Sequence, residues 1–337
     1  MSTDVLLPET ITTPATTEVA ERSISQDVTT IAGRDHVSDS PVQRATLSSS
    51  VIRDYVQLTK PRIVVMILVT TLMTALIGAS GLVAFGSLVW LLVATGLVAG
   101  SAGAANQVWE RSIDRRMPRT ASRPLPDGRL NLFPAAVFTA ILGIGGVWML
   151  GQMFGWAPAV ASIATWVMYV MIYTPMKTRT SLNTTVGAVA GALPVLIGYT
   201  ATGGQLTDWT GWLLVGVLVA WQYPHFMSIA WMYRRQYDEA GFKMTTTVEP
   251  TGRSAGIQSI AGSIAIIGCG IALVWIPGGF WAPGAATALV VAACFPMLKA
   301  SIRFAADPND QLARKLLRSS LLVLPFVLLI VTMRTFF

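Results

Sequence analysis

Apolar runs separated by short polar stretches fill the chain from about residue 63 to its carboxyl end. Each run is about 20 residues long, which is enough for an α-helix to cross the roughly 30 Å hydrocarbon core of a bilayer. The pattern therefore predicts an all-α, polytopic membrane protein with about nine transmembrane helices. The expected helices cover residues 63–85, 86–106, 132–153, 156–173, 184–202, 209–231, 257–276, 281–300 and 316–336. The first of these runs is predicted to break near the turn Gly78-Ala79-Ser80-Gly81.

Basic residues alternate between the loops that join these runs. The loops after the second, fourth, sixth and eighth runs carry six, two, four and five Lys or Arg residues, and the intervening loops carry none. Because basic loops stay on the cytosolic side of a membrane, all four are predicted to be cytosolic. The segment that leads into the first run, 53–62, is also basic. Nine helices then place the amino terminus in the cytosol and the carboxyl terminus outside.

Composition supports the same class of protein. The 337 residues are 53% hydrophobic and 12% charged, and the mean hydropathy is +0.58, which excludes a soluble enzyme of this size. The two cysteines, Cys269 and Cys294, lie in separate apolar runs without CxxC spacing. They therefore predict neither a zinc site nor a disulfide framework.

Residues 1–50 differ from the rest of the chain. They carry seven acidic and three basic residues, a net charge of −4, although the whole chain is +7. This segment is rich in Ser and Thr and has no apolar stretch, which predicts a disordered cytosolic tail ahead of a membrane domain at 51–337. It is also too acidic for a mitochondrial transit peptide, so we expect a bacterial inner membrane.

The densest group of charges follows the second run and reads NQVWERSIDRRMPRTASRP, from Asn106 to Pro124. Within it Asn106, Glu110 and Asp114 recur every four residues, which places them along one face of a helix. Three oxygen-bearing side chains in a row suit Mg²⁺, which prefers hard oxygen ligands. The alternative is a solvated, salt-bridged helix end.

Five arginines interleave with these acids or follow them. Guanidinium groups bind phosphate oxygens in bidentate pairs, so acid beside base at this density predicts a site for a metal-bound diphosphate. A simpler interpretation is that the arginines only mark a cytosolic loop. They are Arg111, Arg115, Arg116, Arg119 and Arg123.

Two further segments carry candidate polar groups. Tyr173 and Lys177 lie four residues apart after the fourth run, where they could bind a diphosphate oxygen or donate to the leaving group. An interfacial aromatic beside a snorkelling lysine is the plain alternative. In the sixth run His225 follows Pro224 and is the only histidine beyond the tail. Such a histidine more often satisfies backbone groups than binds a ligand.

The loop after the sixth run contains Arg234, Arg235, Asp238 and Glu239. Asp238 lies one turn after Arg234, so the pair is either part of a second metal site or an intrahelical ion pair. This loop stands four helices after the first charged loop. That spacing hints at an internal repeat of four-helix units.

Three segments carry a resemblance to a known family: NQVWERSIDRRMPRTASRPLP, YTPMKTRTSLNTTVGAVAGALPVLIGY and WQYPHFMSIAWMYRRQYDEAGFKM. With LTKPR at 58–62, they resemble the haem O synthases (protohaem IX farnesyltransferases), which are UbiA-type intramembrane prenyltransferases. The resemblance covers about residue 55 to the carboxyl end. It implies nine helices around a central cavity with a cytosolic polar cap. It also implies Mg²⁺-dependent transfer of the farnesyl group of farnesyl diphosphate to a vinyl group of haem B.

The resemblance also implies roles for single residues. Asn106, Glu110 and Asp114 would be the first metal motif and, with Lys177, the catalytic set. His225 would approach the porphyrin or its iron. The implied diphosphate contacts are Arg119, Arg123, Tyr173, Lys177, Arg234 and Arg235.

The second motif departs from the family pattern. Haem O synthases often carry two aspartates after its arginine, whereas this chain reads YRRQY, with Arg235 and Gln236 in those places. Either Asp238 or Glu239 supplies the missing metal ligand, or Arg235 contacts the diphosphate directly. The motif therefore leaves open whether one or two Mg²⁺ ions bind.

Two other functions stay open on the residues alone. One is a UbiA-type transferase that acts on a quinone or another aromatic acceptor, and the other is a transporter or haem-binding membrane protein. A transporter usually needs polar groups near the bilayer midplane, whereas the charges here gather at one mouth. The expected partners are haem B, farnesyl diphosphate, the lipid bilayer and a downstream haem A synthase or oxidase assembly factor, with no nucleic acid.

Overall fold

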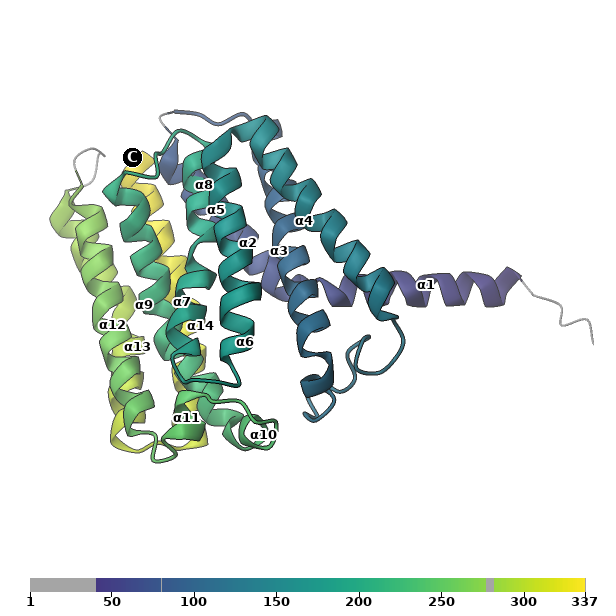
Figure 1. Cartoon of the computed structure of the whole chain (residues 1–337). Helices are drawn as coiled ribbons and strands as arrows, with labels where there is room; N and C mark the ends of the chain where they lie inside the picture. Colours follow the sequence, from purple (N-terminus) through teal and green to yellow (C-terminus); the bar gives the residue numbers. More distant parts are fainter. Residues whose placement is uncertain (1–40, 80, 277–281, 337) are drawn as a thin grey trace, which may run out of the picture. The chain divides into compact units, whose positions relative to one another are not determined.

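The computed structural model describes residues 41–79, 81–276 and 282–336, and these residues form helices and turns without a β-strand. The predicted all-α fold is therefore confirmed (Figure 1). The chain divides into two compact units, Met1–Arg44 and Ala45–Phe337. The helices from α2 onwards lie in the second unit.

Nine helical segments of the described residues are long and apolar enough to cross a membrane, which agrees with the predicted number. Two of them are composite. The fourth consists of α5 (Trp156–Val167), η1 (Met168–Tyr173) and α6 (Thr174–Met176), and the fifth consists of α7 (Asn183–Ala192) and α8 (Pro194–Ala201). The others are α2 (Pro61–Gly78), α3 (Phe85–Asp114), α4 (Leu132–Phe154), α9 (Trp209–Met232), α12 (Arg253–Val274), α13 (Pro283–Ala306) and α14 (Asp310–Phe336).

Three helices lie outside these spans: α1 (Pro41–Leu58), α10 (Arg234–Glu239) and α11 (Thr245–Val248). In Figure 1, α10 and α11 lie at the lower end of the spans, at the same end as the carboxyl terminus of α3. The predicted cytosolic loops after the second and sixth runs thus share one end of the helices.

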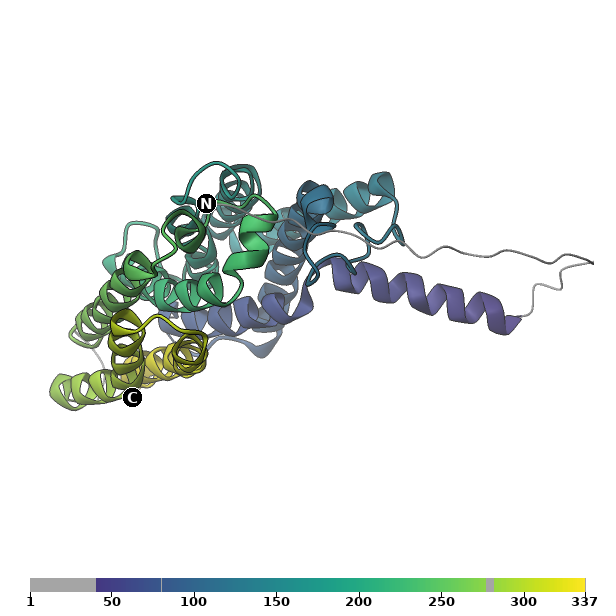
Figure 2. The ribbon, with the colours of Figure 1, turned by 90° about the horizontal axis from the view of Figure 1, so that it is seen from below.

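The interior forms where α9 packs against α7, α12 and α14, while α3 packs against α4. Leu214, Ile266 and Leu328 are almost fully buried between these helices. By contrast, α4 keeps Ile144 and Trp148 exposed on its outer face, as expected for a helix that meets lipid. Seen from below in Figure 2, α12, α13 and α14 group on the opposite side of the unit from α4.

The length of α3 positions the charged stretch. Its 30 residues rise about 45 Å, whereas the hydrocarbon core is about 30 Å thick. About ten residues therefore continue as helix beyond the apolar part. These final turns carry Asn106, Glu110 and Asp114, so one rigid element positions all three.

A π-helical segment, η1, interrupts the fourth span. In a π-turn the backbone bonds reach one residue further than in an α-helix. Here the Thr174 hydroxyl donates to the Tyr169 carbonyl oxygen at 2.9 Å. The register after η1 differs from that of a continuous α-helix, and this register sets the directions of Tyr173 and Lys177.

The predicted break of the first apolar run near Gly78 is confirmed, because α2 ends at Gly78. Its backbone closely approaches α8 there: a Cβ on Gly78 would lie 2.2 Å from the Tyr199 carbonyl oxygen. Other predicted boundaries differ from the structure, because helices continue past their apolar runs: α3 ends at Asp114 instead of 106, α13 ends at Ala306 instead of 300, and α14 begins at Asp310 instead of 316. Residues 41–50, predicted as part of a disordered tail, are helical in α1. Residues 1–40 of that predicted tail lie outside the described residues.

Candidate active site

The three oxygen-bearing residues of α3 lie together on a buried face of the helix. Asn106, Glu110 and Asp114 are between 0% and 4% exposed. Burial of two carboxylates is costly unless cations or hydrogen-bond donors pair with them. The solvated helix end that the spacing also allowed is therefore wrong.

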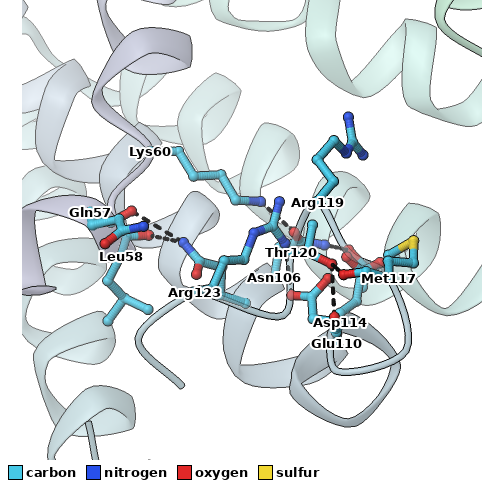
Figure 3. A network of polar contacts seen from close by, with 12 residues as sticks. Gln57, Leu58, Lys60, Asn106, Glu110, Asp114, Met117, Arg119, Thr120 and Arg123 are labelled. Atoms are coloured by element: carbon cyan, nitrogen blue, oxygen red, sulfur yellow. Dashed lines mark hydrogen bonds and ion pairs between the residues drawn. The ribbon is translucent and has the colours of Figure 1, made fainter. Parts of the chain in front are cut away.

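Each of the three side chains pairs with a basic residue, and Figure 3 shows Asn106 with Lys60 and Asp114 with Arg123. The Lys60 ammonium donates to the Asn106 amide oxygen at 2.5 Å. The carboxylate of Glu110 lies 2.8 Å from Lys177 Nζ, and that of Asp114 lies 2.7 Å from an Arg123 guanidinium nitrogen. The tertiary fold thus brings together residues that lie far apart in the sequence.

Two buried carboxylate oxygens of this group have no hydrogen bond among the described residues: Glu110 Oε1, which has only its ion pair with Lys177, and Asp114 Oδ1. Asp114 Oδ1 has no hydrogen bond, whereas Oδ2 pairs with Arg123. A buried carboxylate oxygen without a donor costs free energy, which a bound cation would recover. The described residues contain no cluster of three His, Cys, Asp or Glu side chains. The donor set on α3 has two carboxylates and one carboxamide, which fits Mg²⁺ completed by water and phosphate oxygens.

Lys177 is held by an aromatic pocket as well as by its ion pair. Its ammonium lies 4.7 Å from the centroid of the Tyr173 ring and 5.9 Å from that of Phe242. Burial alone would lower the pKa of Lys177, but the neighbouring Glu110 carboxylate outweighs burial and raises it above the ordinary value. Lys177 is therefore a permanent cation at physiological pH.

The loop after α3 folds back over the carboxyl end of that helix. The Thr120 hydroxyl donates to the Asp114 carbonyl oxygen at 2.9 Å. Arg119 then reaches the second charged region, where its guanidinium lies 4.6 Å from the Tyr233 ring centroid and donates to the Tyr237 hydroxyl at 3.2 Å. Arg119 and Arg123 thus flank the carboxylates from one loop.

An apolar cavity of about 500 Å³ opens beside the charged group. Lys60 and Tyr173 lie at its polar end, and His225 and Trp221 form part of its wall together with apolar residues of α2, α9 and α14. The cavity places a hydrophobic chamber next to an array of cations. It is shaped for a molecule with an anionic head and an apolar body.

Lys60 was not among the predicted site residues. It is the only described non-glycine residue with a positive φ, 57°, and it precedes Pro61. Burial lowers its pKa below the ordinary value of 10.5, and the nearby Lys177 and Arg123 charges act in the same direction. The sequence signal was present in LTKPR, where a lysine immediately precedes the proline that begins an apolar helix.

The charged residues after α9 do not join the buried group on α3. Arg234 forms an ion pair with Asp310 of α14 at 2.8 Å and lies 4.3 Å from the Trp231 ring centroid. Arg235 and Asp238 are exposed on α10, as is the following Glu239. The intrahelical pair between Arg234 and Asp238 is not formed, because Arg234 pairs with Asp310 instead.

His225 lies on α9, away from the carboxylates. Its Nδ1 is 3.0 Å from the Ser320 hydroxyl oxygen of α14, and its ring stacks on Trp221 at a centroid distance of 4.8 Å. The backbone-satisfying role that the sequence also allowed is not what the ring does. It faces a side chain of another helix.

The described residues combine nine spans, buried oxygen-bearing side chains that pair with cations, and an adjoining apolar cavity, which is the arrangement expected of a membrane-embedded prenyltransferase. The model of the UbiA prenyltransferase family matches residues 67–322. The chain belongs to the UbiA prenyltransferase family and is a multi-pass membrane enzyme.

Two protoheme IX farnesyltransferases are similar to this chain over most of its length. The protoheme IX farnesyltransferase of Rhodopirellula baltica is 60% identical over 283 residues, which cover 83% of this chain and 99% of that protein. The protoheme IX farnesyltransferase of Solibacter usitatus is 39% identical over 287 residues, which cover 82% of this chain and 96% of that protein. Both comparisons span most of the membrane domain and include the three motifs.

Solved structures share the fold at low sequence identity. A UbiA homolog from Archaeoglobus fulgidus, bound to DMAPP and Mg²⁺, has a TM-score of 0.64 at 13% identity and covers 82% of this chain and 99% of its own. Digeranylgeranylglyceryl phosphate synthase has a TM-score of 0.69 at 15% identity and covers 84% of this chain and 98% of its own. Both support the same arrangement of helices in this chain.

Proposed function

We propose that this protein transfers the farnesyl group of farnesyl diphosphate to a vinyl group of haem B, giving haem O and diphosphate. The observation that carries the proposal is the buried array of Asn106, Glu110 and Asp114 with its paired cations. It adjoins an apolar cavity through Lys60, which lines the cavity and donates to Asn106. The identity of 60% with the Rhodopirellula baltica protein supports haem as the acceptor.

The diphosphate binds at the cationic mouth in this proposal. Lys60, Lys177 and Arg123 each pair with an α3 side chain in the structure, so their charges are already in place. Arg119 and Tyr173 complete the ring of donors. Fixed cations stabilise the negative charge that develops on the leaving diphosphate without reorganising during the reaction.

Mg²⁺ is the proposed cofactor, held by Asn106, Glu110 and Asp114, and it would supply further positive charge against the diphosphate oxygens. The unpartnered Asp114 Oδ1 is the oxygen best placed to receive it. Asp238 stays a proposed ligand only for a substrate-bound state in which α10 approaches the mouth, because it is exposed here.

The cavity provides the surroundings that the allylic group needs. In the proposed step the C–O bond of the allylic diphosphate ester breaks, and the electron pair leaves with the diphosphate. The haem vinyl group supplies the electrons of the new C–C bond, and water then captures the vinyl-derived cation and loses a proton. Apolar walls and the Tyr173, Trp221 and Phe226 rings exclude water during the first step and favour the cation.

The proposed location is a bacterial inner membrane with a cytosolic amino terminus. The distribution of basic loops supports this orientation, because basic loops stay on the cytosolic side of a membrane. Haem O is then released to a haem A synthase or an oxidase assembly factor in the same membrane.

The test is a reconstituted assay with purified protein, haem B, farnesyl diphosphate and Mg²⁺, with products identified by mass spectrometry. We expect farnesylated haem that requires Mg²⁺ and is lost in Asp114→Asn. The matched control is Asp127→Asn, which makes the same change at an exposed aspartate that pairs with Arg129 at 3.4 Å. It should retain activity.

Two outcomes would contradict the proposal. Prenylation of a quinone but not of haem would assign a different acceptor to the same site. Haem binding without any transfer by folded protein would indicate a haem-binding protein instead of a transferase.

A further inference from the structure

Ser320 of α14 organises the histidine side of the cavity. It is fully buried, and its hydroxyl oxygen lies 3.0 Å from His225 Nδ1. Its carbonyl oxygen accepts a hydrogen bond from Trp221 Nε1 at 2.5 Å. One residue of α14 thus anchors two stacked rings of α9, and both rings line the cavity.

Two contacts of the Ser320 hydroxyl bear on which nitrogen of His225 carries the proton. A serine hydroxyl has a single hydrogen, and the Ser320 oxygen lies closer to the Leu317 carbonyl oxygen, at 2.7 Å, than to His225 Nδ1, at 3.0 Å. When the hydroxyl donates to Leu317, the Ser320 oxygen accepts from His225, which places the ring proton on Nδ1. In the neutral ring, Nε2 then keeps its lone pair.

The lone pair on His225 Nε2 accepts no hydrogen bond from the described part of the protein. The hydrogen bond to Ser320 involves only Nδ1, and no described residue donates to Nε2. The cavity wall around His225 is otherwise largely apolar, with Phe226, Ile229 and Leu324 nearby. Nε2 has no hydrogen bond with a described residue and is not buried, so it is open to a ligand in the cavity.

We propose that Ser320 is a positioning residue, which holds His225 as the Nδ1-protonated tautomer and so presents the Nε2 lone pair to the iron of the haem substrate. A metal-binding imidazole commonly donates its other N–H to a neighbouring oxygen, which sets the tautomer and the ring direction. The inference rests on the proposed function for the identity of the ligand. The tautomer itself is independent of it.

The first test measures the tautomer directly. The chain has two histidines, His225 and His36 in the amino-terminal tail, so His36→Gln leaves a single ring for ¹⁵N-histidine NMR. Protonated Nδ1 is expected in this background and in Ser319→Ala. Ser320→Ala should shift the ring toward protonated Nε2. Protonated Nε2 in the unmutated site, or no change in Ser320→Ala, would overturn the proposal.

Ser319→Ala is the matched control, because Ser319 is the next residue of the same helix and its hydroxyl also donates to a backbone oxygen, at 2.8 Å. It removes the same atoms without touching His225. Ser320→Thr keeps the hydroxyl and should keep the tautomer. A fold defect common to serine losses in α14 would appear in both alanine variants.

The second test titrates full-length protein with ferric haem B and follows absorption and electron paramagnetic resonance spectra. We expect a nitrogen-ligated spectrum that is lost in His225→Ala and restored by added imidazole. Ser320→Ala should weaken this ligation about tenfold or more, as for other outer partners of a metal-binding histidine, while Ser319→Ala stays unchanged. A spectrum without a nitrogen ligand would overturn the proposal and leave farnesyl transfer standing as a separate result.

Discussion

The two charged loops of this protein contain the same kinds of residue, yet only one of them forms a buried site. At the end of α3, Glu110 and Asp114 are buried and each pairs with a cation: Glu110 with Lys177 of a later segment and Asp114 with Arg123 of the following loop. After α9, Asp238 and Glu239 are exposed, and Arg234 pairs with Asp310 on the far side. A cluster of acids and arginines becomes a site only where the fold buries it.

Helix continuity explains the difference. α3 remains one helix through Asp114, so its polar turns stay aligned with the interior. α9 ends at Met232, Tyr233 leaves the helical region, and α10 is a separate six-residue helix without buried residues. The second motif is therefore displaced from the axis of the helix that precedes it.

The largest expected effect comes from Glu110→Gln. It removes the partner of buried Lys177 and a proposed metal ligand, so kcat/KM for farnesyl diphosphate should fall about 100-fold or more. Glu239→Gln makes the same change in the exposed loop and should stay within about twofold of the wild type. Steady-state kinetics on both variants measures the contrast. Equal losses would mean that burial does not separate the two loops.

A second contrast lies between two lysines that are joined through their backbones. Lys177→Met removes a paired cation, so kcat should fall about tenfold to 100-fold through poorer stabilisation of the leaving group. Lys243 donates its backbone N–H to the Lys177 carbonyl oxygen at 2.6 Å and exposes its side chain. Lys243→Met should leave kcat nearly unchanged. Comparable losses in both variants would argue against a charge effect at the mouth.

The pH dependence of the KM for farnesyl diphosphate distinguishes Lys60 from Lys177. Burial lowers the pKa of Lys60, so its charge is present below that lowered value and is lost as pH rises through it, before pH 10.5. The KM for farnesyl diphosphate should therefore rise in the alkaline range, by up to about tenfold per pH unit. Lys177 cannot cause this rise, because its pKa is raised. Lys60→Arg should abolish the rise, and an unchanged profile would assign it to another group.

The smallest effects are expected in the second motif. Arg234→Gln breaks a partly exposed ion pair with Asp310, which is worth about 1 kcal/mol or less. Activity should change by no more than about threefold, and Asp238→Asn should behave alike. A loss above tenfold in Asp238→Asn, with intact folding by thermal unfolding, would mean that α10 closes on the substrate.

Much of this structure could be predicted from the residues themselves. Hydrophobic periodicity and run length located the nine spans that the described residues contain, and the turn residues near Gly78 marked the end of α2. The ends of α3 and α13 and the start of α14 differ from the prediction by six residues or more, because these helices continue past their apolar runs. The four-residue spacing correctly placed Asn106, Glu110 and Asp114 on one face. Spacing within one helix is a local property, so the sequence carries it directly.

Contacts between side chains of different helices could not be predicted from spacing within one helix. Nothing in LTKPR indicates that Lys60 reaches Asn106, and nothing near Ser320 indicates His225, because each contact depends on how whole helices pack. The direction of Arg234 depends likewise on α14. The roles of these side chains as ligands to metal, diphosphate or haem remain predictions, which the proposed variants will decide.

The π-helical segment η1 has a consequence for how related chains are aligned. Because Met168–Tyr173 makes a wider turn, it accommodates about one residue more than an α-helix of the same rise. Deleting the exposed Met171 would restore α-helical register and rotate the next residues of the helix by about 100°. Tyr173 and Lys177 would then turn away from Glu110. A relative that lacks one residue in this segment would keep the tyrosine and lysine in its sequence, but their side chains would not face the carboxylate.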